Sequence, residues 1–266
     1  MYTAAFHYFR PATLGEAEEI FRASDDAHYI AGGQSLIPAM RQRLATPGQL
    51  VDLSRIPSLA FIRHDHKALV IGAGATHAEV AGSGEVQQTI PALAFLAGLI
   101  GDPAVRHRGT LGGSIANNDP AADYPAAVLA LNATICTTRR RIAADDFFTG
   151  MFETALEPGE ILTEISFPVP RRAAYRKFPN PASRYAMPRV FIAEHPDAVR
   201  VAVTGAAPCV YREQTLESAL AANVSPQAID DLAISPGELS SDLFASAEYR
   251  AQLIRVMARR AAAAMI

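Results

Sequence analysis

Two glycine-rich segments carry the residue types that can hold an anion without a basic side chain. The first spans residues 31–36 (AGGQSL) and the second residues 109–114 (GTLGGS). Glycine adopts positive φ readily and lacks Cβ, so the backbone N–H groups around paired glycines can converge on a bound group. Ser35, Thr110 and Ser114 add hydroxyl groups, and neither segment contains Lys or Arg. The pattern indicates a diphosphate held mainly by neutral amide donors.

The first glycine segment lies between a predicted strand and a predicted helix. Such a strand-to-helix turn directs the helix N-terminus at whatever binds there. The unit opens with a predicted helix, whose start is marked by the capping-box spacing of Thr13 and Glu16. The unit itself ends near residue 56. We expect a small α/β unit with helices over residues 13–24 and 36–44 and strands over residues 28–31 and 49–53.

The second glycine segment belongs to a unit that begins near residue 57. Residues 101–123 are rich in glycine and asparagine, and we expect them to form one long loop. A loop of this length in a compact domain favours function over mere connection. Around it we predict a hairpin over residues 61–73, helices from residue 76 and over 91–100 and 124–131, and strands over 134–138 and 160–167.

A competing dinucleotide pattern follows the predicted strand at residues 68–71. Residues 72–77 (GAGATH) resemble the G-x-G-x-x-G fingerprint, but His77 replaces the third glycine, where a small residue is needed for close helix–strand packing. The fingerprint also needs an acidic residue about 20 positions further on to bind the ribose, and none is present there. A self-contained nicotinamide-dependent dehydrogenase is therefore an alternative that the sequence disfavours.

The composition narrows the class of protein. A net charge of −3 gives the chain no electrostatic reason to bind nucleic acid or an anionic membrane. Cys136 and Cys209 stand far apart without metal-ligand spacing, so we expect no metal site in this chain. None of the histidines pairs with a Ser or Cys as a nucleophile would require, so we expect no catalytic residue. Without a signal peptide or a membrane-length apolar run, we expect a soluble, cytoplasmic protein.

The chain changes character after residue 167. Two prolines within residues 168–172 disfavour continued sheet pairing and mark a domain boundary. Beyond it we predict short strands over residues 190–194, 199–204 and 209–212, and a last helix over residues 246–265. The fold class is therefore α+β, with mixed sheets over residues 1–172 and a smaller C-terminal module over residues 173–266.

Several long segments match a known family. They are residues 31–36, 100–114 and 115–125, supported by residues 159–162, 175–178, 181–185 and 245–250. Through them the sequence resembles, nearly end to end, the FAD-binding medium subunits of molybdenum hydroxylases of the xanthine dehydrogenase and carbon monoxide dehydrogenase type. The resemblance implies a bipartite FAD-binding domain of PCMH type, with α/β subdomains over residues 1–56 and 57–172. A C-terminal module of a small antiparallel sheet and helices would follow.

The same resemblance implies which residues bind FAD. The first glycine segment would hold the pyrophosphate from one subdomain, and residues 110–114 would close on it from the other. Asp123 would accept hydrogen bonds from the cofactor, and Lys177 would lie near the isoalloxazine, where a cation favours the reduced flavin. The full implied set is Ile30, Ala31, Gly32, Gly33, Gln34, Ser35, Leu36, Ile37, Ile100, Gly101, Thr110, Leu111, Gly112, Gly113, Ser114, Asp123, Leu162 and Lys177.

The implied activity is that of an oxidoreductase subunit. The partners would be a large molybdopterin-binding subunit and a small subunit with [2Fe–2S] clusters, arranged as a dimer of heterotrimers. Electrons would pass from the clusters through FAD to an external acceptor. Gln34 and Ser114 stand where some relatives have His and Asn, and both keep polar character. A non-catalytic scaffold that has lost FAD is a second alternative, which the intact glycine segments and Asp123 disfavour.

Overall fold

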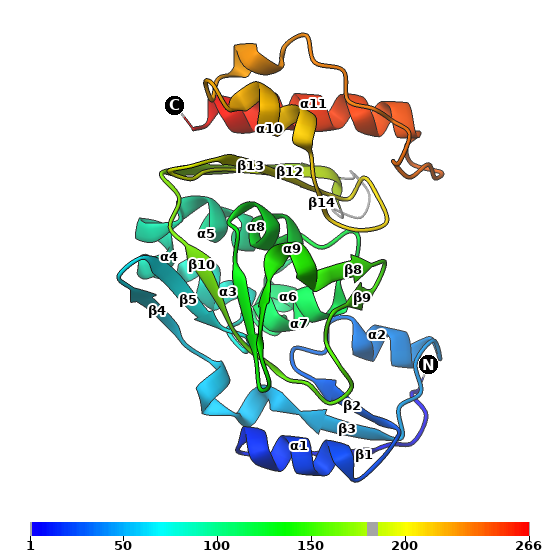
Figure 1. The fold of residues 1–266 in the computed structure, drawn as a ribbon. Helices are drawn as coiled ribbons and strands as arrows, with labels where there is room; N and C mark the ends of the chain where they lie inside the picture. The colour runs from blue at the N-terminus through cyan, green and yellow to red at the C-terminus, as the bar shows by residue number, and fades with distance from the viewer. Residues whose placement is uncertain (1, 180–185, 266) are drawn as a thin grey trace.

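The computed structural model describes residues 2–179 and 186–265, so the supporting segment at residues 181–185 lies outside the described residues. Three larger sheets follow one another along the chain, beside one sheet of two short strands (Figure 1). A small N-terminal sheet is followed by a five-stranded sheet with helices, and then by a four-stranded sheet covered by the last helix. The predicted α+β class is confirmed. The domain boundaries near residues 56 and 172 stay predictions.

The N-terminal unit is a three-stranded parallel sheet in the order β1-β3-β2. Helix α1 begins after Thr13, whose side chain accepts a hydrogen bond from the Glu16 amide. Ala17 of this helix packs with Val51 and Ile56 in one hydrophobic cluster. Strand β1 was not expected, because its side chains are all exposed and carry no alternating pattern. The elements are β1 His7–Phe9, α1 Leu14–Arg22, β2 Ala27–Ile30, α2 Leu36–Arg41, β3 Gln49–Asp52, η1 Leu53–Arg55 and η2 Pro57–Leu59.

The central unit is an antiparallel sheet in the order β4-β5-β10-β6-β7, packed against helices. The capping box at Thr76 and Glu79 is formed as expected. The elements are β4 Ile62–Asp65, β5 Ala68–Gly72, α3 His77–Gly82, α4 Gly84–Thr89, α5 Pro91–Gly98, α6 Pro103–Arg106, α7 Leu111–Asn117, α8 Tyr124–Ala130, β6 Thr134–Thr137, β7 Arg141–Ala143, α9 Ala144–Phe147, β8 Phe148–Gly150, β9 Glu153–Thr154 and β10 Leu162–Pro168. Strands β8 and β9 form a separate two-stranded sheet.

The expectation of one long loop over residues 101–123 is wrong, because α6 and α7 lie within it. Gly112 and Gly113 have poor helix propensity, and this concealed α7 in the sequence. Tertiary contacts override that propensity: Thr110 caps the helix by accepting from the Gly113 amide, and Asn118 ends it in the left-handed conformation with φ 41°. The second glycine segment is therefore the first turn of a helix.

The C-terminal sheet has a different partner on each face. Tyr175, Phe191 and Ala202 point into the core of the central unit, whereas Val190 and Val201 pack with the last helix. This alternation is the two-residue period of a strand buried on both sides. Strand β11 was missed because it follows the prolines directly. The elements are β11 Arg172–Pro179, β12 Ala186–Glu194, β13 Val199–Thr204, β14 Tyr211–Arg212, α10 Gln214–Leu220, η3 Pro226–Ile229 and α11 Ala247–Ala263.

The G-x-G-x-x-G-like turn sits in a sheet of the wrong kind for a nicotinamide-binding fold. Strand β5, which leads into it, pairs antiparallel with both neighbours, whereas the fingerprint requires a parallel βαβ unit. A Cβ on Gly72 would lie 2.3 Å from the carbonyl oxygen of Leu59, so this glycine serves the contact with η2. Among residues 2–179 and 186–265, no helix has the length and apolarity needed to cross a bilayer.

Candidate functional site

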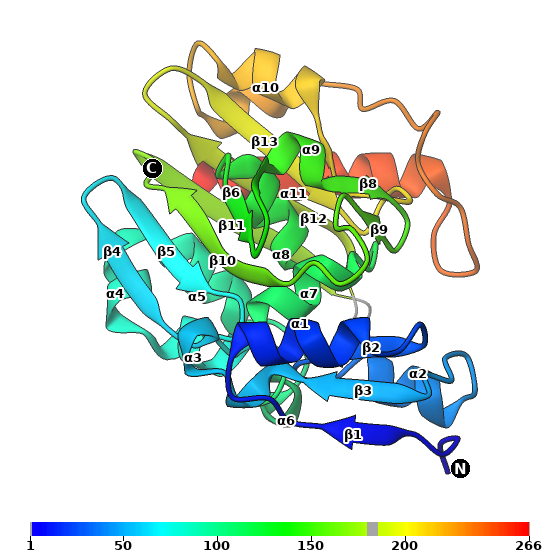
Figure 2. The ribbon, with the colours of Figure 1, turned by 60° about the horizontal axis from the view of Figure 1, so that its bottom comes forward.

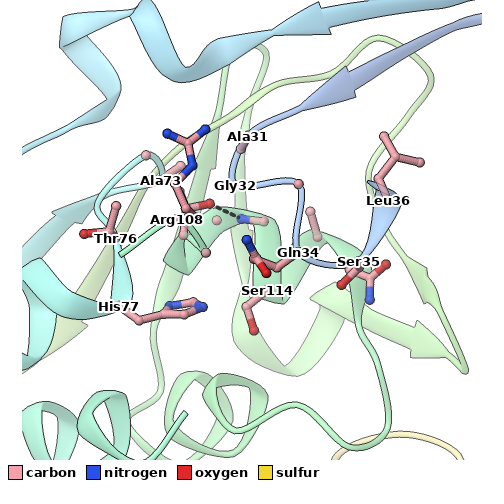
Figure 3. Close-up of a pocket in the computed structure, with 18 of the residues that line it drawn as sticks. Ala31, Gly32, Gln34, Ser35, Leu36, Ala73, Thr76, His77, Arg108 and Ser114 are labelled. Atoms are coloured by element: carbon pink, nitrogen blue, oxygen red, sulfur yellow. Dashed lines mark hydrogen bonds between the residues drawn. The ribbon is translucent and has the colours of Figure 1, made fainter. Parts of the chain in front are cut away.

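The N-terminal unit lies beside α6 and α7 of the central unit (Figure 2). A cavity of about 910 Å³ is lined by residues of both units. Its volume is at the upper end of the range of about 300–1,000 Å³ for small-molecule sites. Both glycine segments line it, together with the turn after β5 and residues from α3 and α6. Figure 3 shows Gly32, Gln34 and Ser35 on one side and His77 and Ser114 on the other.

The first glycine segment contains five consecutive backbone amides that are not used in hydrogen bonds within the described residues. The amides of residues 32–36 find no acceptor within the described residues, while those of Ile37 and Ala39 bond back to Gly33 and Ser35. Gly33 has φ 71°, a left-handed conformation that turns successive N–H groups toward one side. All five residues line the cavity. The turn is therefore built to receive an acceptor-rich, anionic group such as a diphosphate.

The second glycine segment differs, because all of its amides except that of Thr110 already donate to acceptors inside the protein. The Leu111 amide donates to Ala75 O at 2.9 Å and the Gly112 amide to Ala73 O at 2.8 Å. The amides of Gly113 and Ser114 donate to the side chain and carbonyl of Thr110. The interpretation of this segment as a second set of free amide donors is therefore wrong for residues 111–114. The presence of glycine at these positions is explained instead by the close contacts that the segment makes.

The glycines let the two units approach each other backbone to backbone. A Cβ on Gly32 would lie 2.3 Å from Arg108 O and 2.6 Å from Gly109 Cα. A Cβ on Gly112 would lie 2.6 Å from Ala73 Cβ, so the start of α7 is pressed against the turn after β5. Only glycine permits such contacts. The first glycine segment and residues 108–109 are therefore in direct backbone contact at the cavity, and this contact is called the seam between the two units.

Asp123 joins the cavity to the C-terminal sheet. The Tyr175 hydroxyl donates to Oδ1 of Asp123, and the same oxygen lies 3.1 Å from Lys177 Nζ and 3.0 Å from Arg189 Nε. The approach of Arg189 is an ion pair without hydrogen-bond alignment, since its Nε has no hydrogen-bond acceptor in the described residues. Burial lowers the pKa of Lys177, and the charge of Asp123 opposes that effect. Two cations and one carboxylate leave a net positive charge beside the cavity.

Most of the residues implied by the resemblance meet at this cavity. Ile37 and Leu111 do not line it: the first is 40 % exposed and the second is fully buried in the core. Asp123 stands at the N-cap position of α8, but its side chain makes no capping hydrogen bond there. The lining residues from the implied set are Ile30, Ala31, Gly32, Gly33, Gln34, Ser35, Leu36, Ile100, Gly101, Thr110, Gly112, Gly113, Ser114, Asp123, Leu162 and Lys177.

Sequence reasoning missed other lining residues, of which His77 and Arg189 matter most. His77 was noticed only as a departure from the fingerprint. Arg189 is 1 % exposed. The sequence signal that could have identified it is its position directly before the apolar residues 190–193, because an arginine in such a run is buried only with a partner. Among residues 2–179 and 186–265, no group of three His, Cys, Asp or Glu side chains that could hold a metal ion occurs.

Comparison with known proteins identifies the family of the chain. Residues 4–170 match the family described as the FAD binding domain in molybdopterin dehydrogenase. The carbon monoxide dehydrogenase medium chain of Hydrogenophaga pseudoflava is 35% identical over 273 residues, which cover 96% of this chain and 95% of the relative. The nicotine 6-hydroxylase medium subunit of Paenarthrobacter nicotinovorans is 33% identical, covering 96% and 95%.

Solved structures agree in fold. A structure of carbon monoxide dehydrogenase from Hydrogenophaga pseudoflava that lacks the Mo-pyranopterin moiety matches with a TM-score of 0.91 and 35% identity, over 100% of this chain and 98% of that one. The quinoline 2-oxidoreductase of Pseudomonas putida 86 matches with a TM-score of 0.90 and 28% identity, covering 100% and 98%. The resemblance read from the sequence is confirmed, and the chain belongs to the family of FAD-binding medium subunits of molybdenum hydroxylases.

Proposed function

We propose that the cavity between the N-terminal and central units binds FAD, with the diphosphate on the amides of residues 32–36. The observation that carries this proposal is a run of five residues that line a cavity of about 910 Å³ and whose amides have no acceptor among the described residues. Neutral donors suit a buried diphosphate, because they need not be stripped of a tightly held hydration shell as a lysine would. A cavity of this size suits a dinucleotide better than a mononucleotide.

We assign the flavin side of the cavity to the neighbourhood of Asp123. Lys177 Nζ also donates to Leu99 O at 3.2 Å, so its ammonium is held in place by two acceptors. Arg189 donates to Ala122 O at 3.1 Å and is fixed in the same way. Positive charge held beside the isoalloxazine favours its reduced form, which carries more negative charge, and raises its potential.

The chain would work as one relay of a larger complex. Bound FAD would accept electrons one at a time from [2Fe–2S] clusters of a small subunit and deliver them in pairs to an external acceptor. Substrate chemistry would take place at molybdenum in a large subunit. The relatives named as medium chains or medium subunits support such an assembly. A dimer of heterotrimers and a cytoplasmic location stay predictions.

The proposal is tested on purified full-length chain, alone and with its companion subunits. We expect flavin absorbance between about 350 and 500 nm and FAD by mass analysis of the released cofactor. Gly113→Val should abolish FAD retention, because its branched side chain would displace Thr110 Oγ1, 2.9 Å from the new Cβ, and project toward Ala31 Cβ, 4.0 Å from it. Gly15→Ala is the matched control, since nothing lies within 4 Å of a Cβ at that exposed position.

The outcomes separate the candidate functions. Colourless material that cannot be reconstituted with FAD, even beside its companions, would favour the scaffold that has lost its cofactor. Normal flavin stoichiometry in the Gly113→Val protein would mean that the cofactor lies elsewhere. Loss of flavin in the Gly15→Ala control would mean that the assay reports general instability.

A further inference from the structure

The central unit needs a donor of its own on its side of the cavity. The four amides that begin α7 are all engaged, so within the second glycine segment only the Thr110 amide is without an acceptor in the described residues. Side chains must then supply most of the hydrogen bonds from that side. His77 is one of these side chains: it lines the cavity although it is only 5 % exposed, and its ring points toward Ser114 (Figure 3).

The direction of the His77 side chain is fixed by its position in the fold. It is the first residue of α3, whose N-cap Thr76 makes a complete capping box with Glu79. The His77 amide donates to Gly109 O at 2.9 Å, which ties the helix start to the second glycine segment. A Cβ on Gly109 would lie 2.6 Å from His77 Nε2, so the glycine leaves space for the ring.

His77 packs against a second side chain with an unmet polar atom. His77 Nδ1 and the Tyr124 hydroxyl are both buried without a hydrogen-bond partner in the described residues. Their rings are in contact, with centroids 5.4 Å apart and planes inclined by 45°. A phenolic O–H donates and an unprotonated imidazole nitrogen accepts, so a hydrogen bond between the two would satisfy both atoms at once. The tautomer of a neutral histidine is set by such a partner.

We propose that Tyr124 donates to Nδ1 of His77 and thereby holds the ring proton on Nε2, from which His77 donates a hydrogen bond to an acceptor oxygen of the bound dinucleotide. His77 is the binding residue and Tyr124 is a positioning residue. The inference rests on the proposed function. Burial lowers the pKa of His77 to about 4, so the ring is neutral near pH 7 and keeps one donor and one acceptor.

The test compares FAD affinity in full-length variants by flavin fluorescence titration. His77→Leu should bind FAD about tenfold to a hundredfold more weakly, the loss expected for one hydrogen bond to a charged or polar ligand group. His77→Gln should stay within about threefold of the parent, because its amide nitrogen restores the donor. Tyr211→Phe is the matched control for Tyr124→Phe, since its hydroxyl is likewise buried without a partner in the described residues, but its ring packs in the cluster of the last helix and not against His77.

The second readout is the ¹⁵N spectrum of the imidazole in histidine-labelled protein at pH 7. The parent should show Nε2 protonated and Nδ1 unprotonated, and Tyr124→Phe, unlike Tyr211→Phe, should shift the His77 signals. Equal weakening in His77→Leu and His77→Gln, parent-like affinity in His77→Leu, or a proton on Nδ1 in the parent would each overturn the inference. A parent that binds no FAD at all would instead overturn the proposed function, and melting temperatures identify any variant that fails to fold.

Discussion

Gly32→Ala is the most direct test of the seam between the two units. The added Cβ would lie 2.3 Å from Arg108 O and 2.6 Å from Gly109 Cα, and both obstacles are backbone atoms that cannot rotate away. Carbon–oxygen contacts are ordinarily about 3.3–3.6 Å, so the two segments must separate by about 1 Å. Overpacking of this kind costs about 1–3 kcal/mol. If the cost falls on the closed arrangement that binds FAD, the dissociation constant rises by about 5- to 150-fold.

The assay is a titration of cofactor-free chain with FAD, followed by fluorescence, beside thermal unfolding of the same samples. Gly15→Ala adds the same methyl group within α1, where it meets nothing within 4 Å. It should leave the affinity unchanged and stabilise the helix by about 0.5–1 kcal/mol. A Gly32→Ala protein with the affinity and melting temperature of the parent would refute the reasoning, because the seam would then have to open without cost.

Two further predictions concern buried charges. Asp123→Asn leaves Lys177 and Arg189 without a counter-charge and should lower the free energy of unfolding by about 3–5 kcal/mol in denaturant titrations; an unchanged midpoint would show that both cations reach water. Burial alone raises the pKa of Glu160, but hydrogen bonds, the first from Arg140, outweigh it and lower the pKa to about 2. Ionised Glu160 therefore makes its full contribution to the free energy of unfolding above pH 4.5, and this contribution is lost as the pH falls toward 2. Its size is about 1–2 kcal/mol after allowance for the solvent around Arg140. Glu160→Gln should remove that acid-linked part, and parallel pH profiles of parent and variant would count against it.

The regular elements with strong patterns were predictable from the sequence. The strand–turn–helix around the first glycine segment appears close to its expected place, with β2 at Ala27–Ile30 and α2 at Leu36–Arg41. The apolar segment after Pro91 forms α5, and proline stands at its start as expected. These elements were found because propensity, capping residues and burial all favour the same structure.

The rest depended on contacts between distant parts of the chain. Helix α7 contains Gly112 and Gly113, and it forms because Ala73 and Ala75 accept hydrogen bonds from its first turn. No local sequence pattern predicts that the carbonyl groups of Ala73 and Ala75 accept these hydrogen bonds. The ion pairs of Asp123 with β11 and β12 span more than 50 residues of sequence and were implied only in part, through Lys177. The availability of each backbone amide likewise became visible only in three dimensions.

Lys177 and Arg189 face each other as register partners on β11 and β12. Two like charges in such a position repel each other, and nothing in the register relieves the repulsion. Relief comes from Asp123, which belongs to the other half of the protein. The C-terminal hairpin is therefore electrostatically incomplete when it stands alone. Docking and folding of this module are coupled, and a chain severed near residue 172 should yield two fragments that each need the other to become stable.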